Sequence, residues 1–277
     1  MTNNTDHKVI IAVAPNGARK TKLDHGKLPI SPEELATTAR ACQEAGAAMI
    51  HLHVRDAQDQ HSLDPERYRA AIVKVRAQVG DEMIIQVTTE AVGKYKPVEQ
   101  MDCVKQLKPE AVSIAIAELI PVAGDDLEVA RFLEWLYRSQ IAPQFILYSE
   151  ADIEHFTTLV QRGVIHSDNP SVLLVLGRYS QNQQSDPKEL SPLIETLQPH
   201  YSWSVCAFGQ SESECMVKAI DLGGHCRIGF ENNLLSENGN LAIDNANQVE
   251  FTAAKAKSHD RGLASASEAR LIMGVRC

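Results

Sequence analysis

Short apolar segments alternate with longer segments of helical period along the whole of this 277-residue chain. Runs rich in Val and Ile predict buried strands, and apolar residues three or four apart predict amphipathic helices. Eight strand-helix pairs of this kind predict a (β/α)8 TIM barrel, an α/β fold of about 250 residues. The expected strands are Val9–Ala14, Ala48–Val54, Met83–Thr88, Ala111–Ala117, Gln144–Tyr148, Val172–Leu176, Ser202–Cys206 and His225–Phe230. The expected helices are Pro32–Ala45, Pro65–Val79, Val98–Leu107, Asp126–Gln140, Glu150–Arg162, Pro187–Leu197, Ser211–Leu222 and Asn245–Ser258.

Start and stop signals agree with these limits. Ser31 and Pro32 offer an N-cap hydroxyl and a proline at the first helical position, and Gly46 follows the same helix. A doubly wound open sheet is the alternative fold, but it needs fewer units, and no GxGxxG motif follows the first strand. No linker divides the chain, so we expect a single barrel domain over residues 1–277. Asn238-Gly239-Asn240 predicts a turn or short hairpin before the last helix.

Composition excludes several classes of partner. The chain carries 27 Lys+Arg against 36 Asp+Glu, a net charge of -9, which argues against nucleic-acid binding. Its apolar stretches are much shorter than the roughly 20 residues of a membrane-spanning helix, and the first eight residues lack the apolar core of a signal peptide. We therefore expect no membrane partner and a cytoplasmic location. The cysteines form no CxxC pair, which argues against a cysteine zinc site: Cys42, Cys103, Cys206, Cys215, Cys226 and Cys277.

Two histidines stand at the end of the second expected strand, where a TIM barrel places its chemistry. His51 and His53 are separated by one residue, so both imidazoles project from the same face of the strand. They are either two hydrogen-bonded histidines at the rim or half of a metal site. A polar pair in an otherwise apolar buried strand is costly without partners, which favours the metal site.

The last expected strand supplies a third ligand. Glu231 ends this strand, which neighbours the first two strands in a closed barrel, so its carboxylate can reach the two histidines. Two histidines and a carboxylate with an open position suit catalytic zinc and also non-haem iron. Arg227, four residues earlier in the same strand, is expected on the same face as Glu231. Its partner is either a substrate carboxylate or an acid of a buried structural ion pair.

Other polar residues follow the remaining strands. Thr88 and Thr89 close the third strand and Glu118 follows the fourth, and each is either a rim residue or a substrate contact. The loop after the first strand brings Asn16 and Arg19 to the same mouth. We expect Arg19, Arg55 and Arg227 to gather at this rim, and we interpret Cys206 as a packing residue because no feature of the sequence lowers its pKa.

Five motifs in consistent order resemble the β-keto acid cleavage enzymes: PNGAR, LPISPEE, HLHVRD, VTT and GGHCRIGFENN. The similarity runs from about Val9 to Ile272. This resemblance implies a zinc-dependent barrel enzyme that converts a β-keto acid and acetyl-CoA into acetoacetate and a new acyl-CoA. It also implies a homotetramer.

The resemblance assigns roles to individual residues. The metal ligands of the family match His51, His53 and Glu231, its strand-three hydroxyl falls on Thr88, and its strand-eight arginine falls on Arg227. An acid often follows the glutamate ligand in this family, whereas this chain has Asn232, which cannot act as that base.

Two further positions bear on the substrate and on CoA. Arg19, with Ile146 in strand five, predicts a substrate that is anionic or polar-neutral at its far end. The turns after strands six and seven, residues 177–179 and 207–209, are expected on the side of CoA.

Three rival functions remain at the level of sequence. A metal-dependent lyase or aldolase on the same barrel would cleave the keto acid without CoA. An amidohydrolase-type enzyme is weaker, because its HxH follows strand one and its other ligands end later strands. A ligand-binding or scaffold barrel without chemistry is the third, and Asn232 lends it support.

Overall fold

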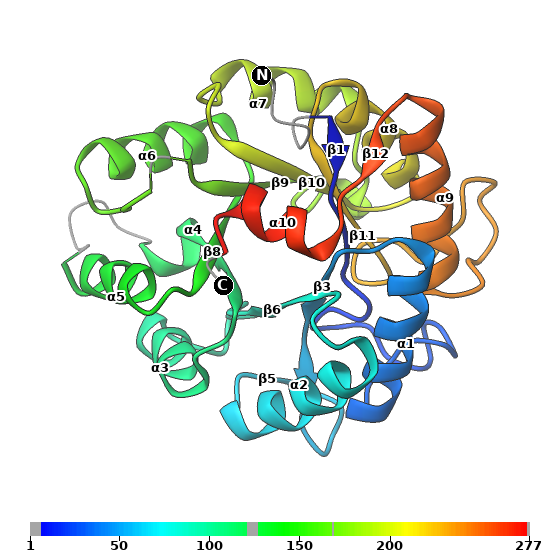
Figure 1. The fold of residues 1–277 in the computed structure, drawn as a ribbon, viewed down its shortest axis with the longest axis horizontal. Helices are drawn as coiled ribbons and strands as arrows, with labels where there is room; N and C mark the ends of the chain where they lie inside the picture. The colour runs from blue at the N-terminus through cyan, green and yellow to red at the C-terminus, as the bar shows by residue number, and fades with distance from the viewer. Residues whose placement is uncertain (1–6, 121–126, 168, 276–277) are drawn as a thin grey trace.

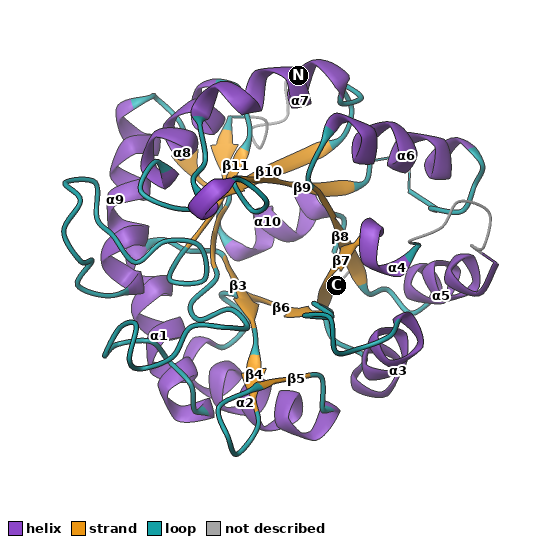
Figure 2. Cartoon of the chain, turned by 180° about the vertical axis from the view of Figure 1, so that it is seen from behind, coloured by secondary structure: helices purple, strands orange, loops and turns teal. Residues whose placement is uncertain are grey.

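Eight parallel strands close into a barrel with the helices around its outside (Figures 1 and 2). The computed structural model describes residues 7–120, 127–167 and 169–275. Each strand pairs with the next in the cyclic order β2-β3-β6-β7-β8-β9-β10-β11, and Cys226↔Ile11 is one register of the closing pair β11·β2. The barrel strands are β2 (Ile11–Val13), β3 (Met49–Leu52), β6 (Ile84–Thr88), β7 (Ala111–Ala115), β8 (Ala142–Leu147), β9 (Ser171–Leu176), β10 (Ser202–Ala207) and β11 (His225–Ile228).

The surrounding helices begin and end at the signals in the sequence. Ser31 accepts a bond from the backbone N–H of Glu34, whose carboxylate bonds back to Ser31 N–H, so α1 opens on a capping box. Gly46 ends α1 in the left-handed region at φ 115°. The helices are α1 (Pro32–Ala45), α2 (Pro65–Val79), α3 (Pro97–Leu107), α4 (Ile116–Leu119), α5 (Leu127–Arg138), α6 (Glu150–Gln161), α7 (Leu190–Thr196), α8 (Glu212–Asp221), α9 (Asn245–Ser258) and α10 (Ala266–Met273), with 3-10 turns η1 (Gln181–Gln183) and η2 (Pro187–Glu189).

Helix α10 closes the amino end of the barrel, and in Figure 1 it crosses the middle of the ring of strands. Ala269 and Met273 of this helix pack on residues that begin the strands, including Ile10, Met49 and Ile84. Beside it the short strand β1 (Lys8–Val9) pairs in parallel with β12 (Gly262–Leu263). A second small sheet, β4 (Val54–Arg55) with β5 (His61–Ser62), extends the chain beyond β3. The carboxyl ends of the strands are therefore the end left for a site.

The predicted barrel is confirmed, with differences at element ends. The strand expected at Ala111–Ala117 ends at Ala115, because Ile116–Leu119 turns into α4. The strand expected at His225–Phe230 ends at Ile228, because Gly229 takes φ 131° and breaks the extended backbone. Leu235↔Leu241 forms an isolated antiparallel bridge, which confirms the turn predicted at residues 238–240.

Several elements were not predicted, among them the small strands β5 and β12, the short helix α4, the 3-10 turn η1 and helix α10. Asp126 and Cys277, named in the sequence predictions, lie outside the described residues. The five described cysteines are buried free thiols: Cys42, Cys103, Cys206, Cys215 and Cys226. Within the described ranges no helix has the length and apolar character needed to cross a membrane.

Candidate metal centre

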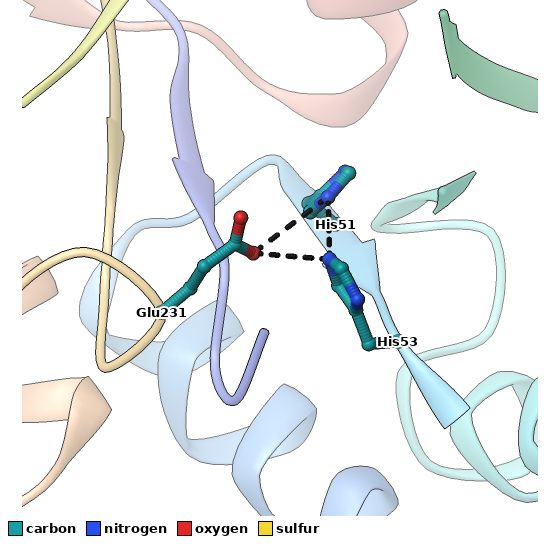
Figure 3. Close-up of side chains that lie close together, drawn as sticks. All are labelled: His51, His53 and Glu231. Carbon is teal, nitrogen blue, oxygen red and sulfur yellow. Dashed lines mark hydrogen bonds and ion pairs between the residues drawn. The ribbon is translucent and has the colours of Figure 1, made fainter. Parts of the chain in front are cut away.

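Three side chains from two distant parts of the chain converge at the carboxyl end of the barrel (Figure 3). His51 lies in β3, His53 follows it, and Glu231 lies in the turn after β11. The two Nε2 atoms are 3.1 Å apart, and Glu231 Oε2 lies 3.7 Å from His51 Nε2 and 3.3 Å from His53 Nε2. The structure thus brings together the three predicted metal ligands.

The turn that carries Glu231 is built from close backbone contacts. A Cβ on Gly229 would lie 2.5 Å from Ala14 O, and a Cβ on Gly17 would lie 2.6 Å from Glu231 Cγ, so glycine is required at both positions. Lys20 Nζ donates to the carbonyl oxygen of Glu231 at 2.6 Å. Arg55, which we expected to gather at this rim, donates to Gly17 O and so holds this loop. The loop after β2 therefore fixes the position of Glu231.

His51 is neutral in this setting. Burial and the nearby charge of Arg227 lower the pKa of His51 to about 3, so its ring is unprotonated at neutral pH. His51 Nδ1 donates to Gln86 Oε1 at 2.8 Å, which leaves the lone pair on Nε2, the atom that faces Glu231. His53 Nδ1 is buried without a hydrogen bond, and the nearest carboxylate oxygen, Glu90 Oε2, is 4.0 Å away.

The cluster fits a divalent metal ion. Glu231 Oε2 is buried and has no hydrogen bond, although its carboxylate is charged: burial raises the pKa of Glu231, but Arg227 and both histidines hold it well below its ordinary value. Metal-ligand distances of about 2.0–2.1 Å in a tetrahedral site require ligand atoms about 3.3 Å apart. The three observed separations scatter around that spacing.

Arg227 lies beside the cluster with part of its guanidinium unused. Its Nη2 donates to Glu231 Oε1 at 3.2 Å and to Cys206 Sγ at 3.4 Å. Its Nε and Nη1 are buried and have no hydrogen bond. The structural ion pair expected for Arg227 is therefore present, and two of its nitrogen atoms remain free to bind an anion such as a substrate carboxylate. Burial raises the pKa of the Cys206 thiol to about 11, which agrees with a packing role for this cysteine.

A second charged group lies over the mouth, and its central residue, Glu90, was not predicted from the sequence. Glu90 Oε1 accepts hydrogen bonds from Arg19 Nη1 at 2.7 Å and from Arg178 Nη2 at 2.8 Å. The guanidinium of Arg178 also lies 5.1 Å above the ring of Phe208. Arg178 and Glu90 are 88 positions apart, so only the fold reveals their pairing. The charge at the end of VTTE was the one local signal for Glu90.

Most of the other predicted substrate residues line one narrow cavity of about 30 Å³ next to His51. Thr88 Oγ1 accepts a bond from Glu90 N–H, whereas Thr89 Oγ1 donates to Ser113 O. Glu118 Oε2 accepts bonds from Ala91 N–H and from a glutamine side chain, and burial raises its pKa. The predicted residues that line this cavity are Thr88, Thr89, Glu118, Ile146, His51, Arg227 and Glu231.

Two further predicted residues, Asn16 and Asn232, do not line this cavity. Asn16 is fully buried, and its Nδ2 donates to the carbonyl oxygens of Pro29 and His53. It therefore supports the backbone of His53, one of the three predicted metal ligands. Asn232 Nδ2 lies 3.8 Å from Cys206 Sγ, and its Oδ1 is buried without a partner. Their roles toward substrate stay predictions.

A larger cavity, of about 1430 Å³, lies at the opposite end of the barrel beside α10. Among the residues that line it, Glu110 is already paired with Arg76 and Arg270. Size alone would favour it, but it lacks the converging ligand atoms and the unpaired buried groups of the cavity at His51. The smaller cavity is therefore the candidate site.

Sequence comparisons agree with the motifs. The model of the beta-keto acid cleavage enzyme family matches residues 8–275, which confirms the resemblance. The 3-keto-5-aminohexanoate cleavage enzyme of Acetoanaerobium sticklandii is 29% identical over 97% of this chain and 98% of its own length. The 3-oxoadipate:acetyl-CoA acetyltransferase of Cupriavidus necator is 27% identical over 96% of this chain and 94% of its own length.

Solved structures show the same fold. ObcA bound to oxaloacetate superposes with a TM-score of 0.73 at 17% identity, over 91% of this chain and 68% of its own. A type I 3-dehydroquinate dehydratase from Clostridium difficile superposes with a TM-score of 0.58 at 9% identity, over 92% of this chain and 93% of its own. At these identities the likeness concerns the barrel.

Proposed function

Since the chain belongs to the beta-keto acid cleavage enzyme family, we propose that it transfers an acetyl group from acetyl-CoA to a β-keto acid and cleaves the product. The acetyl group ends on the CH2–COO⁻ fragment as acetoacetate, and the remaining acyl group ends on CoA as a new thioester. Curated relatives carry the names of acetyl-CoA transferases and of a keto acid cleavage enzyme. The observation that carries the proposal is the convergence of the ligand atoms of His51, His53 and Glu231 beside the free donors of Arg227.

His51, His53 and Glu231 would hold a Zn²⁺ ion. When bound, zinc supplies Lewis-acid stabilisation of negative charge on substrate oxygens. A neutral imidazole with a free Nε2 and a charged carboxylate are the protonation states that metal binding needs, and the pKa values of His51 and Glu231 are shifted toward those states.

Arg227 binds the negative charge of the substrate. Its Nε and Nη1 lie in a buried position without partners, so a carboxylate or developing oxyanion that reaches them gains two charge-assisted hydrogen bonds. Thr88 orients a substrate oxygen. Its Oγ1 already accepts the N–H of Glu90, which leaves its own hydroxyl proton to donate into the cavity.

Asn232 holds a polar group in place and does not remove a proton. An amide oxygen accepts hydrogen bonds but is not a base at neutral pH, and Asn232 Oδ1 is buried and free to accept. Proton removal from the substrate is therefore left to another group or to the acidity that the polarised substrate itself acquires.

The far end of the substrate is anionic or polar-neutral in this proposal. Arg178 lines the cavity, Arg19 reaches the same carboxylate of Glu90, and Ile146 offers an apolar wall. An incoming substrate carboxylate can replace the carboxylate of Glu90 as the hydrogen-bond partner of Arg19 and Arg178. A cationic end would meet Arg178 and Arg227 at the cavity wall.

Purified protein, zinc and acetyl-CoA with a panel of β-keto acids would test the activity, with acetoacetate and acyl-CoA as the products measured. We expect both products in equal amounts, and none without acetyl-CoA. Cleavage that proceeds without acetyl-CoA would show the rival lyase reaction. No cleavage of any keto acid under either condition would support the scaffold.

A comparison of 3-oxoadipate with 3-keto-5-aminohexanoate would test the far end of the substrate. We expect a higher kcat/KM for the dicarboxylic acid, and Arg178→Ala should reduce that preference. A faster reaction with the amino acid would contradict this part of the proposal. Light scattering would check the expected homotetramer.

A further inference from the structure

A chain of hydrogen-bonded amides crosses the interior of the barrel and ends at His51. His51 Nδ1 donates to Gln86 Oε1 at 2.8 Å, and Gln86 Nε2 donates to Gln144 Oε1 at 3.1 Å. Gln144 Nε2 then lies 3.3 Å from Ser171 Oγ and 3.4 Å from Ser204 Oγ. All donors point away from the metal centre.

These amides lie in the part of the barrel where polar groups are most costly. Gln86 and Gln144 are completely buried, and two residues before each of them, on the same strand face, stand the core residues Ile84 and Ala142. Buried amides without partners are destabilising, and apolar side chains would fill the same space without that requirement. The two glutamines therefore indicate a function for the chain of hydrogen bonds.

The orientation of Gln86 decides which nitrogen of His51 carries the proton. With its oxygen toward His51, the ring holds its proton on Nδ1 and offers the lone pair of Nε2 to a metal. With its NH2 group toward His51, the proton moves to Nε2 and blocks that atom. Gln144 Oε1 binds the NH2 group of Gln86 and so selects the first orientation. The serine hydroxyls at the far end can accept from Gln144 and do not oppose it.

We infer that Gln86 and Gln144 are positioning residues that together hold His51 in the tautomer that binds the metal. This inference rests on the proposed metal site and deepens it, because it assigns a role to two residues that touch neither metal nor substrate. Gln144 acts only through Gln86, so the two residues must behave as one unit.

The experiment measures the affinity for Zn²⁺ by competition with a chromophoric chelator and, in metal-free protein, the His51 tautomer by ¹⁵N NMR of labelled histidine. The His51→Ala variant assigns the resonance. Gln86→Met should lose about 10- to 100-fold in zinc affinity, the range found for partners of metal-ligating histidines. Gln86→Glu, which still accepts from Nδ1, should retain most of it.

Gln144→Met should weaken zinc binding in the same direction and move the metal-free His51 toward a mixture of tautomers. The double variant Gln86→Met/Gln144→Met should bind no more weakly than Gln86→Met alone. Thr252→Val, which removes a buried hydroxyl of α9 bonded to Gln248 O, is the matched control and should leave affinity and tautomer unchanged. If Gln144→Met does not fold, Ser171→Ala/Ser204→Ala removes the same support and should give the same direction of change.

Wild-type zinc affinity and an unchanged tautomer in Gln144→Met would overturn the inference, as would additive losses in the double variant. Failure of the proposed metal site looks different. In that case wild-type protein binds no zinc, whereas the metal-free tautomer of His51 still responds to Gln86→Met and Gln144→Met.

Discussion

The two ends of this barrel hold the same kinds of charged side chain in opposite states. At the amino end Glu110 accepts bonds from Arg270 Nε at 2.6 Å and from Arg76 Nη2 at 2.9 Å. At the carboxyl end Arg227 and Glu231 pair through one nitrogen and one oxygen, and their remaining buried Nε, Nη1 and Oε2 atoms have no hydrogen bond. The first arrangement holds α10 against the barrel.

Unpaired buried polar atoms cost about 1–3 kcal/mol each, so the second arrangement lowers stability unless something else binds there. Buried charge alone therefore does not mark a site. A site is marked instead by buried hydrogen-bond donors and acceptors that have no partner in the protein.

His51→Ala removes one ligand from the carboxyl end. We expect the zinc content to fall to background and kcat/KM to drop about 10³-fold, because a metal ion supplies several kcal/mol of charge stabilisation and 1.36 kcal/mol is tenfold in rate. Elemental analysis and the acetoacetate assay check this. Stoichiometric zinc and unchanged activity in the variant would remove the proposed centre.

A matched pair of substitutions compares the two ends directly. In zinc-loaded protein Arg227→Met should lower kcat/KM about 10²- to 10³-fold, because it deletes the donors for substrate charge. Arg270→Met should lower the free energy of unfolding by about 2–3 kcal/mol, because it leaves Glu110 with one partner fewer, and should leave kcat/KM unchanged.

Steady-state kinetics and denaturant unfolding of both variants provide the measurements. A large decrease in kcat/KM for Arg270→Met would contradict the proposed difference between the two ends. So would a change in Arg227→Met that is confined to the free energy of unfolding.

Zinc should stabilise the carboxyl end in wild-type protein. At a free zinc concentration 100 times the Kd the gain is about 2.7 kcal/mol. For a protein of this size that corresponds to a rise in Tm of roughly 5 °C. Differential scanning calorimetry with and without chelator checks it, and His51→Ala should show no rise. An equal rise in that variant would mean that zinc binds elsewhere.

His225 tests the amino end with a smaller effect. Its Nδ1 accepts the N–H of Ile10 at 3.2 Å, and burial, with the nearby charge of Arg261, lowers its pKa to about 3. Its folded pKa lies below the unfolded value of about 6.5, so the unfolded chain binds the extra proton and stability falls as the pH drops from 6.5 toward 3.

His225→Asn keeps an acceptor near the position of Nδ1 and should reduce the slope of stability against pH in that window by up to about 1.4 kcal/mol per pH unit. Urea unfolding between pH 4 and 7 measures the slope. The zinc affinity should not change, in contrast to substitutions of His51. An unchanged slope would show that His225 does not carry the acid sensitivity.

Local patterns predicted the barrel because the sequence signals for each strand and helix lie within a few residues of that element. The limits of α1, α2 and α9 match the sequence signals. Helix α10 escaped prediction although Ser265 and Glu268 form a capping box, because the eightfold repeat was already complete before it. The error at Ala115 arose because Ile116 and Ala117 continue an apolar run whose backbone turns into α4.

The residues of the site likewise fall into those that local patterns predict and those that only the fold brings together. His51, His53 and Glu231 could be predicted because each lies near the carboxyl end of a strand and the barrel places these ends together. The pairing of Glu90 with Arg178 could not be predicted, since it depends on two loops meeting over the mouth. Gln86 carried a weak signal as the polar residue in IIQVT, but its partner Gln144 lies on a strand two places away in the barrel.

The closing pair of strands also has a consequence for biosynthesis. Two ligands lie at positions 51 and 53, whereas the third, at 231, reaches them only after β11 pairs with β2. A nascent chain that has exposed its first two hundred residues therefore offers a metal ion only a pair of imidazoles. High-affinity metal capture should coincide with the final closure of the ring, so a metal-responsive probe on ribosome-bound chains would time that closure.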